Sequence, residues 1–532
     1  MDSEQGSKNI RFHYSGYVIF AVQIFSVITG LIFTLLLTRN MNPNQFGIWT
    51  NIFDYIGYFT LFSGVFPFWA ERFVARGRYN AVKTGTMAQL VTGLFFTVVY
   101  FPIIFFIYKD AIAPKIGAMS YLPIFLIAGT YIVSFYMIIA FEGLLQPRRP
   151  QALGYGLLIE EIVKVSLALV LILGFGQLFY GAVLSLVLSC FAQVGYYAWL
   201  LRKDFKVKTN WSYAKEWFKG SAAMAYNAVG GQLLSFVYIL LFFLGGPDTR
   251  AYYQAATSFG VIISYAISLS IALYPRLLSN SCSREQVGSS FRTVMMLGIP
   301  LASINIAMSY SFLTVLNIAY GEAWPVLVAL SFLTLFGLVS SFYNNCVMGV
   351  ESFDAEGKIS LRELVKSKVF KVFTLPYIQA AIALPSTFLA LTQLPVAGSV
   401  QATLIVIIIL IISQALTFSL LYRFMHREIS IPVDWRSLGK YVLASAAVAV
   451  ILFFTPTTTT LIPTAVKAIM GFLLYLALLL VIDKQARELL RQVWAEIKGN
   501  LHVLRGKPKL PQVENTALPF EKLAILRQDL RG

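Results

Sequence analysis

The stretch Arg-Arg-Pro-Gln-Ala-Leu-Gly-Tyr-Gly-Leu-Leu-Ile-Glu-Glu-Ile-Val-Lys, residues 148 to 164, begins in a basic loop and continues as an apolar segment to Phe175. It predicts a membrane helix with Glu160, Glu161 and Lys164 in its interior. Spacings of three and four residues place Lys164 on the same face as both glutamates. Because a charge at a helix centre costs about 2.5–3.5 kcal/mol on insertion scales, we expect these side chains to face a protein interior or a wet cavity.

Composition places the whole chain in the membrane class. Of its 532 residues, 58% are hydrophobic and 13% are charged, whereas soluble domains carry about 25% charged residues. The three cysteines and three histidines have no metal-ligand spacing, and no phosphate-binding loop of the form Gly-x-x-x-x-Gly-Lys-Ser/Thr occurs. We therefore expect no metal, no nucleotide and no other cofactor, except H⁺ or Na⁺ as a coupling ion.

Fourteen apolar runs are long enough to cross a bilayer of about 30 Å. They are residues 16–38, 47–69, 86–107, 121–144, 153–175, 178–201, 220–244, 251–273, 292–318, 326–349, 369–393, 396–422, 438–456 and 461–482. With the N-terminus inside, all but six of the 42 Lys and Arg residues fall in inside segments, and only four fall in outside loops. This alternation predicts a multi-pass protein of the cell membrane with both termini cytoplasmic. It also explains the net charge of +17 without a nucleic-acid partner.

An internal repeat has an offset of roughly 205 residues. The turn at residues 42–49 matches residues 246–253, Ser134-Phe135-Tyr136 recurs as Ser341-Phe342-Tyr343, and Lys164 falls opposite Lys371. We therefore predict an all-α polytopic membrane protein with two six-helix lobes, related by a parallel repeat, and two C-terminal helices. The expected parts are a cytoplasmic N-terminus (1–15), an N-lobe (16–201), a basic linker (202–219), a C-lobe (220–422), the last two helices (438–482) and a basic amphipathic tail (483–532).

This organisation resembles the multidrug/oligosaccharidyl-lipid/polysaccharide exporter superfamily, and within it the polysaccharide-transporter branch of O-antigen-type flippases. The resemblance rests on the helix count, the repeat, the Gly47-Ile48-Trp49 element that opens helix two, and the basic Lys164 in helix five. It implies a transporter, not an enzyme, that moves a polyprenyl-(pyro)phosphate oligosaccharide across the membrane by alternating access. The implied partners are that lipid-linked substrate and the bilayer, with glycan-assembly enzymes as further candidates.

Two alternatives stay open beside that interpretation. A cation-coupled multidrug or metabolite antiporter of the same superfamily generally uses an acid in helix one or around helices seven and eight. No Asp or Glu lies in residues 16–38, 220–244 or 251–273. A membrane enzyme or scaffold of glycan assembly is disfavoured by the short outer loops, of which the longest joins Tyr108 to Ser120. The lipid II flippase branch uses several cavity arginines, yet Arg292, at a helix start, is the one arginine inside these spans.

The candidate site residues fall into three groups, each with a structural alternative. The candidate phosphate-binding cations are Lys164, Lys371, Lys368 and Arg292, for which a local salt bridge, snorkelling to headgroups or a topology signal is the alternative. The candidate coupling acids are Glu160, Glu161 and Asp54, and a structural hydrogen bond is equally plausible for Asp54. The candidate cavity amides are Asn227, Asn305, Asn344, Asn345 and Gln379, with interhelical hydrogen bonding as the alternative. Glu142 and Glu351 end corresponding helices and are candidate gate residues.

Overall fold

The computed structural model describes residues 22–23, 25–75, 77–78, 80–117, 119–206, 208–270, 283–350, 368–394, 398–428, 431–483, 486–488 and 491. Over these residues the chain consists of helices and short turns, without a strand. It forms two compact units, Met1–Tyr475 and Leu476–Gly532, so that both predicted lobes belong to the first unit. The N-terminal segment before residue 16 and almost all of the predicted tail lie outside the described residues.

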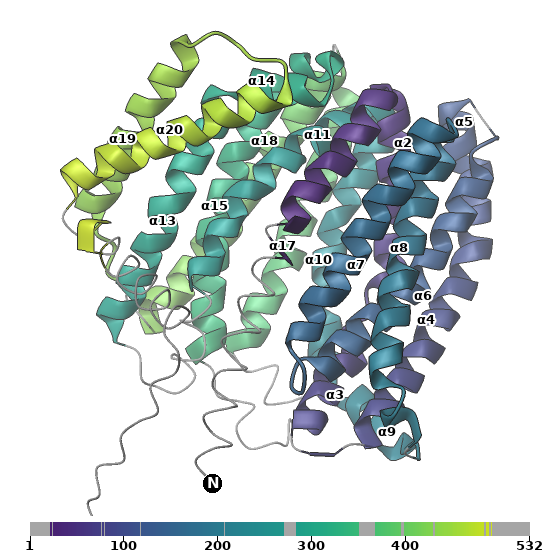
Figure 1. Cartoon of the computed structure of the whole chain (residues 1–532). Coiled ribbons are helices and arrows are strands. Elements are labelled where there is room, and N and C mark those ends of the chain that lie inside the picture. The colour runs from purple at the N-terminus through teal and green to yellow at the C-terminus, as the bar shows by residue number, and fades with distance from the viewer. Residues whose placement is uncertain are drawn as a thin grey trace, which may run out of the picture. The chain divides into compact units, whose positions relative to one another are not determined.

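The first half of the chain contains the apolar helix Phe25–Asn40 and then the helices that correspond to spans two to six (Figure 1). These are α2 (Pro43–Thr60), α3 (Val65–Ala75), α4 (Asn80–Ile107), α5 (Ala113–Ile116), α6 (Leu122–Leu145), α7 (Gln151–Ala168) and α8 (Leu178–Leu201). Short π-helical segments, η1 (Tyr108–Ile112) and η2 (Leu169–Gly174), follow α4 and α7.

The second half begins with α9 (Trp211–Gly220) and continues through the helices of spans seven to fourteen. These are α10 (Ala222–Leu240), α11 (Pro247–Ser264), α13 (Arg284–Ala307), α14 (Ser309–Leu316), α15 (Trp324–Val350), α17 (Lys368–Gln393), α18 (Ser399–Glu428), α19 (Trp435–Phe454) and α20 (Leu461–Ile482). The segments η4 (Leu241–Gly245) and η5 (Tyr265–Ser270) extend α10 and α11.

Over the described residues, the fourteen spans expected from hydropathy lie largely on helices; residues 16–21, 24, 271–273 and 396–397 of these spans lie outside the described residues. Among the described residues, ten helices are long and apolar enough to cross a membrane, and Phe25–Asn40 is a shorter apolar helix. Span two is divided between α2 and α3 by a turn at residues 61–64, and span five ends in η2. The chain is therefore a nearly all-helical, multi-pass membrane protein.

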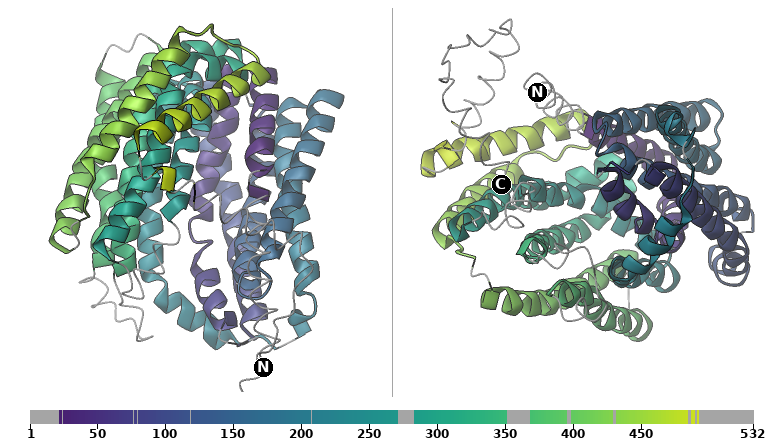
Figure 2. Two further views of the ribbon diagram at one scale, coloured as in Figure 1. Left: turned by 60° about the vertical axis from the view of Figure 1, so that its left-hand side comes forward. Right: turned by 90° about the horizontal axis from the view of Figure 1, so that it is seen from below.

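Helix packing repeats between the two halves of the first unit. In the first half α4 packs on α6, α6 on α8, and α7 on α8; in the second half α13 packs on α15, α15 on α18, and α17 on α18. These are the same pairs in repeat numbering: third with fourth, fourth with sixth, and fifth with sixth. Figure 2 shows the helices up to α8 gathered on one side and those from α13 to α18 on the other. The parallel repeat predicted from short sequence echoes is thus a repeat of packing.

The matching turns at residues 42 and 246 each begin a helix. Asn42 caps α2 in a capping box with Gln45, and Pro43 occupies the first helical turn, where its missing N–H costs nothing. In the second copy Pro247 begins α11 after Gly246, whose φ of +96° favours glycine at that position. The two helices that these turns start, α2 and α11, pack on each other and join the two halves.

The segment between the lobes is folded onto the first half. Helix α9 buries Trp217, whose ring meets Phe73 edge-on with centroids 5.4 Å apart. Ser221, at the start of α10, accepts a hydrogen bond from the indole N–H of Trp69 at 2.9 Å. The predicted linker at residues 202–219 therefore contains a docked helix that ties α10 to α3.

Candidate functional site

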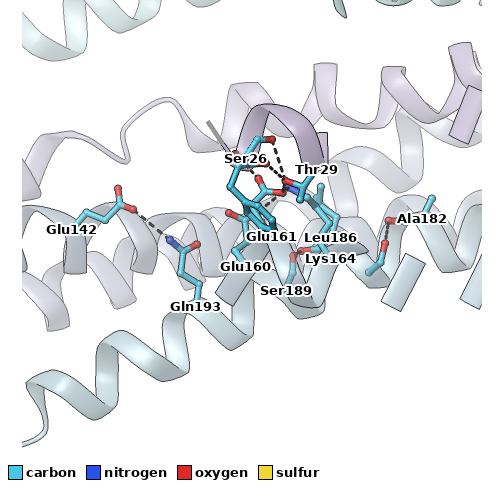
Figure 3. Close-up of polar contacts among 12 residues, drawn as sticks. Ser26, Thr29, Glu142, Glu160, Glu161, Lys164, Ala182, Leu186, Ser189 and Gln193 are labelled. Atoms are coloured by element: carbon cyan, nitrogen blue, oxygen red, sulfur yellow. Dashed lines mark hydrogen bonds and ion pairs between the residues drawn. The ribbon is translucent and has the colours of Figure 1, made fainter. Parts of the chain in front are cut away.

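The charged residues of span five form a buried ion-pair network. The ammonium of Lys164 lies 2.9 Å from a carboxylate oxygen of Glu161 and 3.4 Å from one of Glu160. The three side chains are 10%, 4% and 17% exposed, respectively. The i,i+3 and i,i+4 spacing thus produces the contacts expected of one helix face. Figure 3 shows both carboxylates turned toward Lys164 in the interior of the first half.

The first helix completes this network. Ser26 and Thr29 each donate a hydroxyl hydrogen bond to Glu161, at 2.6 Å, one to each carboxylate oxygen. Glu161 therefore joins helix one to α7 with charge-assisted hydrogen bonds, which are about twice as strong as neutral ones. Glu160, Glu161 and Lys164 together carry a formal charge of −1, since two carboxylates face one ammonium.

A third carboxylate extends the polar interior of the first half. Glu142, on α6, lies 3.2 Å from the hydroxyl of Tyr197 and 3.4 Å from the amide nitrogen of Gln193, both on α8. Figure 3 shows the Glu142–Gln193 contact. The sequence-based prediction made Glu142 part of a gate, and this role stays a prediction.

Asp54 forms an ion pair between the two halves of the molecule. Its two carboxylate oxygens accept hydrogen bonds from Nε and Nη2 of Arg250, both at 2.8 Å, and the side chains are only 6% and 5% exposed. The guanidinium also donates to Gln254 at 3.1 Å and lies over the ring of Tyr238, 5.0 Å from its centroid. This two-bond geometry uses the fork of donors that arginine provides, so the contact is strongly directional.

Further contacts between the halves lie near the end of helix one and the starts of α2 and α11. Asn317 donates to the carbonyl of Thr38 at 3.0 Å, and Arg39 donates to the carbonyl of Val315 at 3.1 Å. Gly47 approaches the backbone of Pro247 so closely that an added Cβ would overlap the proline carbonyl. This gives a physical reason for the glycine of the Gly47-Ile48-Trp49 element: the two repeat-related helix starts touch there.

The second half contains an uncharged polar cavity of about 420 Å³ among α11, α15, α17 and α18. Its polar lining residues are Ser264, Thr334, Ser340, Ser341, Asn344, Gln379, Gln414 and Thr417. Two of the predicted cavity amides, Asn344 and Gln379, thus line the same cavity. A smaller recess of about 130 Å³ shares Gln379 and Gln414 with it and reaches Tyr238 and Tyr253.

The other predicted site residues have varied surroundings. Lys371 is exposed, with its ammonium 5.3 Å from the centroid of Phe424. Arg292 lies 3.5 Å from Asp434, at the start of α19. Asn305 is buried and donates to the carbonyl of Phe259 at 3.0 Å, which is the interhelical alternative. Asn227 and Asn345 are exposed. Lys368 begins α17, its side chain is not among those described, and Glu351 lies outside the described residues.

Sequence reasoning missed Arg250, as well as Ser26, Thr29 and Gln414. Loop charge counting placed Arg250 in an outside loop, because it lies only three residues into α11. A usable signal was Asp54, a lone acid in span two, since such an acid needs an opposite charge on a neighbouring helix. Span eight, related to span two by the repeat, offered Arg250 near its start. Over the described residues, no group of three or more His, Cys, Asp or Glu side chains could hold a metal ion.

Solved structures with the same fold are transporters. The chain is similar to the lipid II flippase MurJ in an inward closed conformation, with a TM-score of 0.60, 14% identity, and coverage of 89% of this chain and 100% of that one. It is also similar to an inward-facing multidrug resistance MATE family transporter of the MOP superfamily, with a TM-score of 0.57, 11% identity, and 77% and 98% coverage. A MOP superfamily transporter from Pyrococcus furiosus gives a TM-score of 0.52, 12% identity, and 81% and 96% coverage. The fold is that of MOP-type transporters.

The family follows from the sequence itself. The profile of the family described as "Polysaccharide biosynthesis protein" matches residues 15–281, half of the chain. The chain belongs to this family, and the resemblance to the polysaccharide-transporter branch is confirmed. It is a multi-pass membrane transporter of the MOP type rather than an enzyme. No curated protein matches it at a significant level.

Proposed function

We propose that this transporter moves a lipid-linked oligosaccharide, a glycan on a polyprenyl (pyro)phosphate, across the cell membrane by alternating access. Membership of the polysaccharide biosynthesis family supports a glycan as cargo. The same fold serves the lipid II flippase MurJ, which moves a lipid-linked substrate. Both termini face the cytoplasm in this proposal, as the loop charges predict, so that the contacts around Gly47, Thr38 and Arg250 lie toward the outer face.

The observation that carries the mechanism is the buried network of Glu160, Glu161 and Lys164. Its formal charge of −1 inside a membrane bundle favours the uptake of one cation, H⁺ or Na⁺, which would neutralise it. We therefore assign coupling to the two glutamates. Because Glu161 also holds Ser26 and Thr29, ion uptake there acts on the contact between helix one and α7.

This geometry changes the proposed role of Lys164 in phosphate binding. Its ammonium already contacts two carboxylates, so it attracts a phosphate only when protons on the glutamates leave its charge uncompensated. Proton uptake and phosphate binding are then linked. Lys371, exposed at the start of α17, is the candidate cation that needs no such change. Arg292 is less available, because it pairs with Asp434.

The test is transport by the full chain in proteoliposomes that contain a fluorescent polyprenyl diphosphate oligosaccharide. We expect wild-type protein to move it faster with an imposed H⁺ or Na⁺ gradient, and Glu161→Gln to abolish the gradient dependence. Arg148→Ala is the matched control, because it breaks the more exposed pair with Asp204 at 3.1 Å. Wild-type protein that leaves the lipid in place with either gradient would refute the proposal.

The same assay separates the alternative function. A cation-coupled drug or metabolite antiporter, which the similarity in fold to the MATE transporter keeps open, would export a soluble organic cation such as ethidium. Ethidium export that depends on Glu161, with no movement of the glycolipid, would favour the antiporter.

A further inference from the structure

We infer that the polar cavity of the second half is a subsite for an uncharged sugar unit of the transported glycan. This inference rests on the proposed function. It adds that the second half of the protein binds a sugar of the substrate. The cavity, about 420 Å³ in volume, falls in the range of about 300–1,000 Å³ typical of small-molecule sites.

The lining has the chemistry that sugar hydroxyls require. Asn344, Gln379 and Gln414 each offer an amide that donates and accepts hydrogen bonds, and Ser and Thr hydroxyls surround them. Within the part of the chain that the structure describes, the lining includes no Asp, Glu, Lys or Arg. A neutral hydroxyl-rich ligand therefore matches this wall better than a phosphate, which needs an opposite charge. Phe418, the aromatic residue in the lining, offers a face on which a sugar ring can pack.

One polar atom of the cavity residues lacks a partner within the protein. The side-chain oxygen of Asn344 is buried and accepts no hydrogen bond. Such an atom costs about 1–3 kcal/mol when nothing compensates it. The oxygen lies away from the cavity surface, so the Asn344 side chain must rotate before a sugar hydroxyl in the cavity can supply the missing donor.

The cavity has part of its wall in common with the smaller recess. The smaller recess shares Leu333, Gln379 and Gln414 with the cavity, and it ends on Tyr238 and Tyr253. Arg250, which pairs with Asp54, lies over those two rings, 5.0 and 5.9 Å from their centroids. A sugar in this subsite is therefore linked, through the recess and its two tyrosine rings, to the ion pair that must separate if the halves move apart at this face.

The experiment measures binding to the purified full chain of two lipids: polyprenyl diphosphate carrying a neutral disaccharide, and polyprenyl diphosphate alone. We expect wild-type protein to prefer the glycolipid about tenfold, as two or so net hydrogen bonds would provide. The double variant Gln379→Leu, Gln414→Leu should bind both lipids equally. Gln393→Leu is the matched control, because this glutamine is exposed at the far end of the same helix, α17.

A second variant, Ser341→Phe, fills the cavity without removing an amide and should also abolish the preference. A retained tenfold preference in both variants overturns the subsite. Transport in proteoliposomes, measured in parallel, keeps the two proposals apart. A wild-type protein that moves the glycolipid yet binds both lipids equally refutes the subsite alone. One that prefers the glycolipid but does not move it supports the subsite and refutes the proposed function.

Discussion

The contact between helix one and helix five of the first half, and its repeat-related counterpart between α10 and α17, are built from different chemistry. In the first half Ser26 and Thr29 hold Glu161, which pairs with Lys164. In the second half the ring of Tyr226 stacks on Phe370 and Tyr377, with centroids 4.8 and 4.5 Å apart. One copy of the repeat thus keeps ionisable groups inside, and the other replaces them with aromatic rings.

The same contrast recurs at other equivalent positions. Ser134 is fully buried and bonds to the carbonyl of Tyr131 on its own helix, whereas Ser341 lines the polar cavity. Lys164 is enclosed by carboxylates, whereas Lys371 is exposed. The difference teaches that the two copies of a structural repeat can hold different chemistry; in the mechanism that we propose, one copy responds to ions and the other binds a neutral sugar.

The largest effect that tests this comparison is expected from Lys164→Ala. Removing the ammonium leaves two carboxylates buried without their partner, and breaking a buried pair in this way costs about 3–5 kcal/mol. Lys371→Ala, the equivalent change at an exposed residue, should cost at most about 0.5–1 kcal/mol, the worth of its cation–π contact with Phe424. Denaturant unfolding of the two detergent-solubilised variants measures both losses of unfolding free energy. Equal losses would show that the two lysines occupy similar surroundings after all.

The next effect is expected where the two copies touch. In Gly47→Val the new side chain would overlap the backbone of Pro247, so α2 and α11 would have to separate. Overpacking of this kind costs about 1–3 kcal/mol, enough to shift the equilibrium between contact and separation of α2 and α11 by about fivefold or more. Transport rate and labelling of an engineered cysteine near Thr38 report the change. Gly195→Val is the control, because a Cβ at Gly195 meets nothing within 4 Å.

The aromatic contact should respond to mutation but not to pH. Tyr226→Leu loses two stacked ring pairs, each worth about 0.5–1.5 kcal/mol beyond simple burial. The free energy of unfolding should therefore fall by about 1–3 kcal/mol. The loss should be the same at pH 5 and at pH 8. A loss that varies with pH over this range would mean that this contact also contains an ionising group.

The smallest effect is expected at Asp434, in the loop before α19. The hydroxyl of Ser437, 2.6 Å away, lowers the pKa of this carboxyl, and the Ser437 N–H and Arg292 act in the same direction. The pKa of Asp434 in the folded state lies below its usual value. The charged carboxylate therefore contributes fully to folding stability above the usual pKa, and this contribution is lost as the pH falls through the lowered pKa. Asp434→Ala should cost about 0.5–1 kcal/mol at pH 7, as loss of an N-cap does.

That loss should shrink toward zero in strongly acidic solution, which unfolding experiments between pH 2 and pH 7 can follow. Asp204→Ala is a suitable comparison, since Asp204 is part of a half-buried pair with Arg148. A cost at Asp434 that stays constant down to the lowest pH would contradict the role of its charge.

Much of the fold was predictable because hydrophobic length and loop charge are local properties of the chain. Over the described residues each expected span lies largely on helix, and the turn at Asn42 begins one. The site was predictable only in part. The pairing of Lys164 with both glutamates follows from positions on one helix, but Ser26 and Thr29 come from more than 130 residues away. The topology of the chain ends, the lobe boundaries and the coupling ion stay predictions.

The sequence by itself determined that this chain crosses the membrane many times as a repeated bundle and that charges lie inside helix five. The reason is that the length of an apolar run and the spacing of residues on one helix can both be read along the chain. Only the tertiary structure decided which charges meet. Asp54 finds Arg250, Lys164 is enclosed, and Asn344 and Gln379 share one cavity with Gln414. The physical reason is that a buried charge or amide is stabilised by its neighbours in space, and helix packing brings together residues that no spacing along the chain connects.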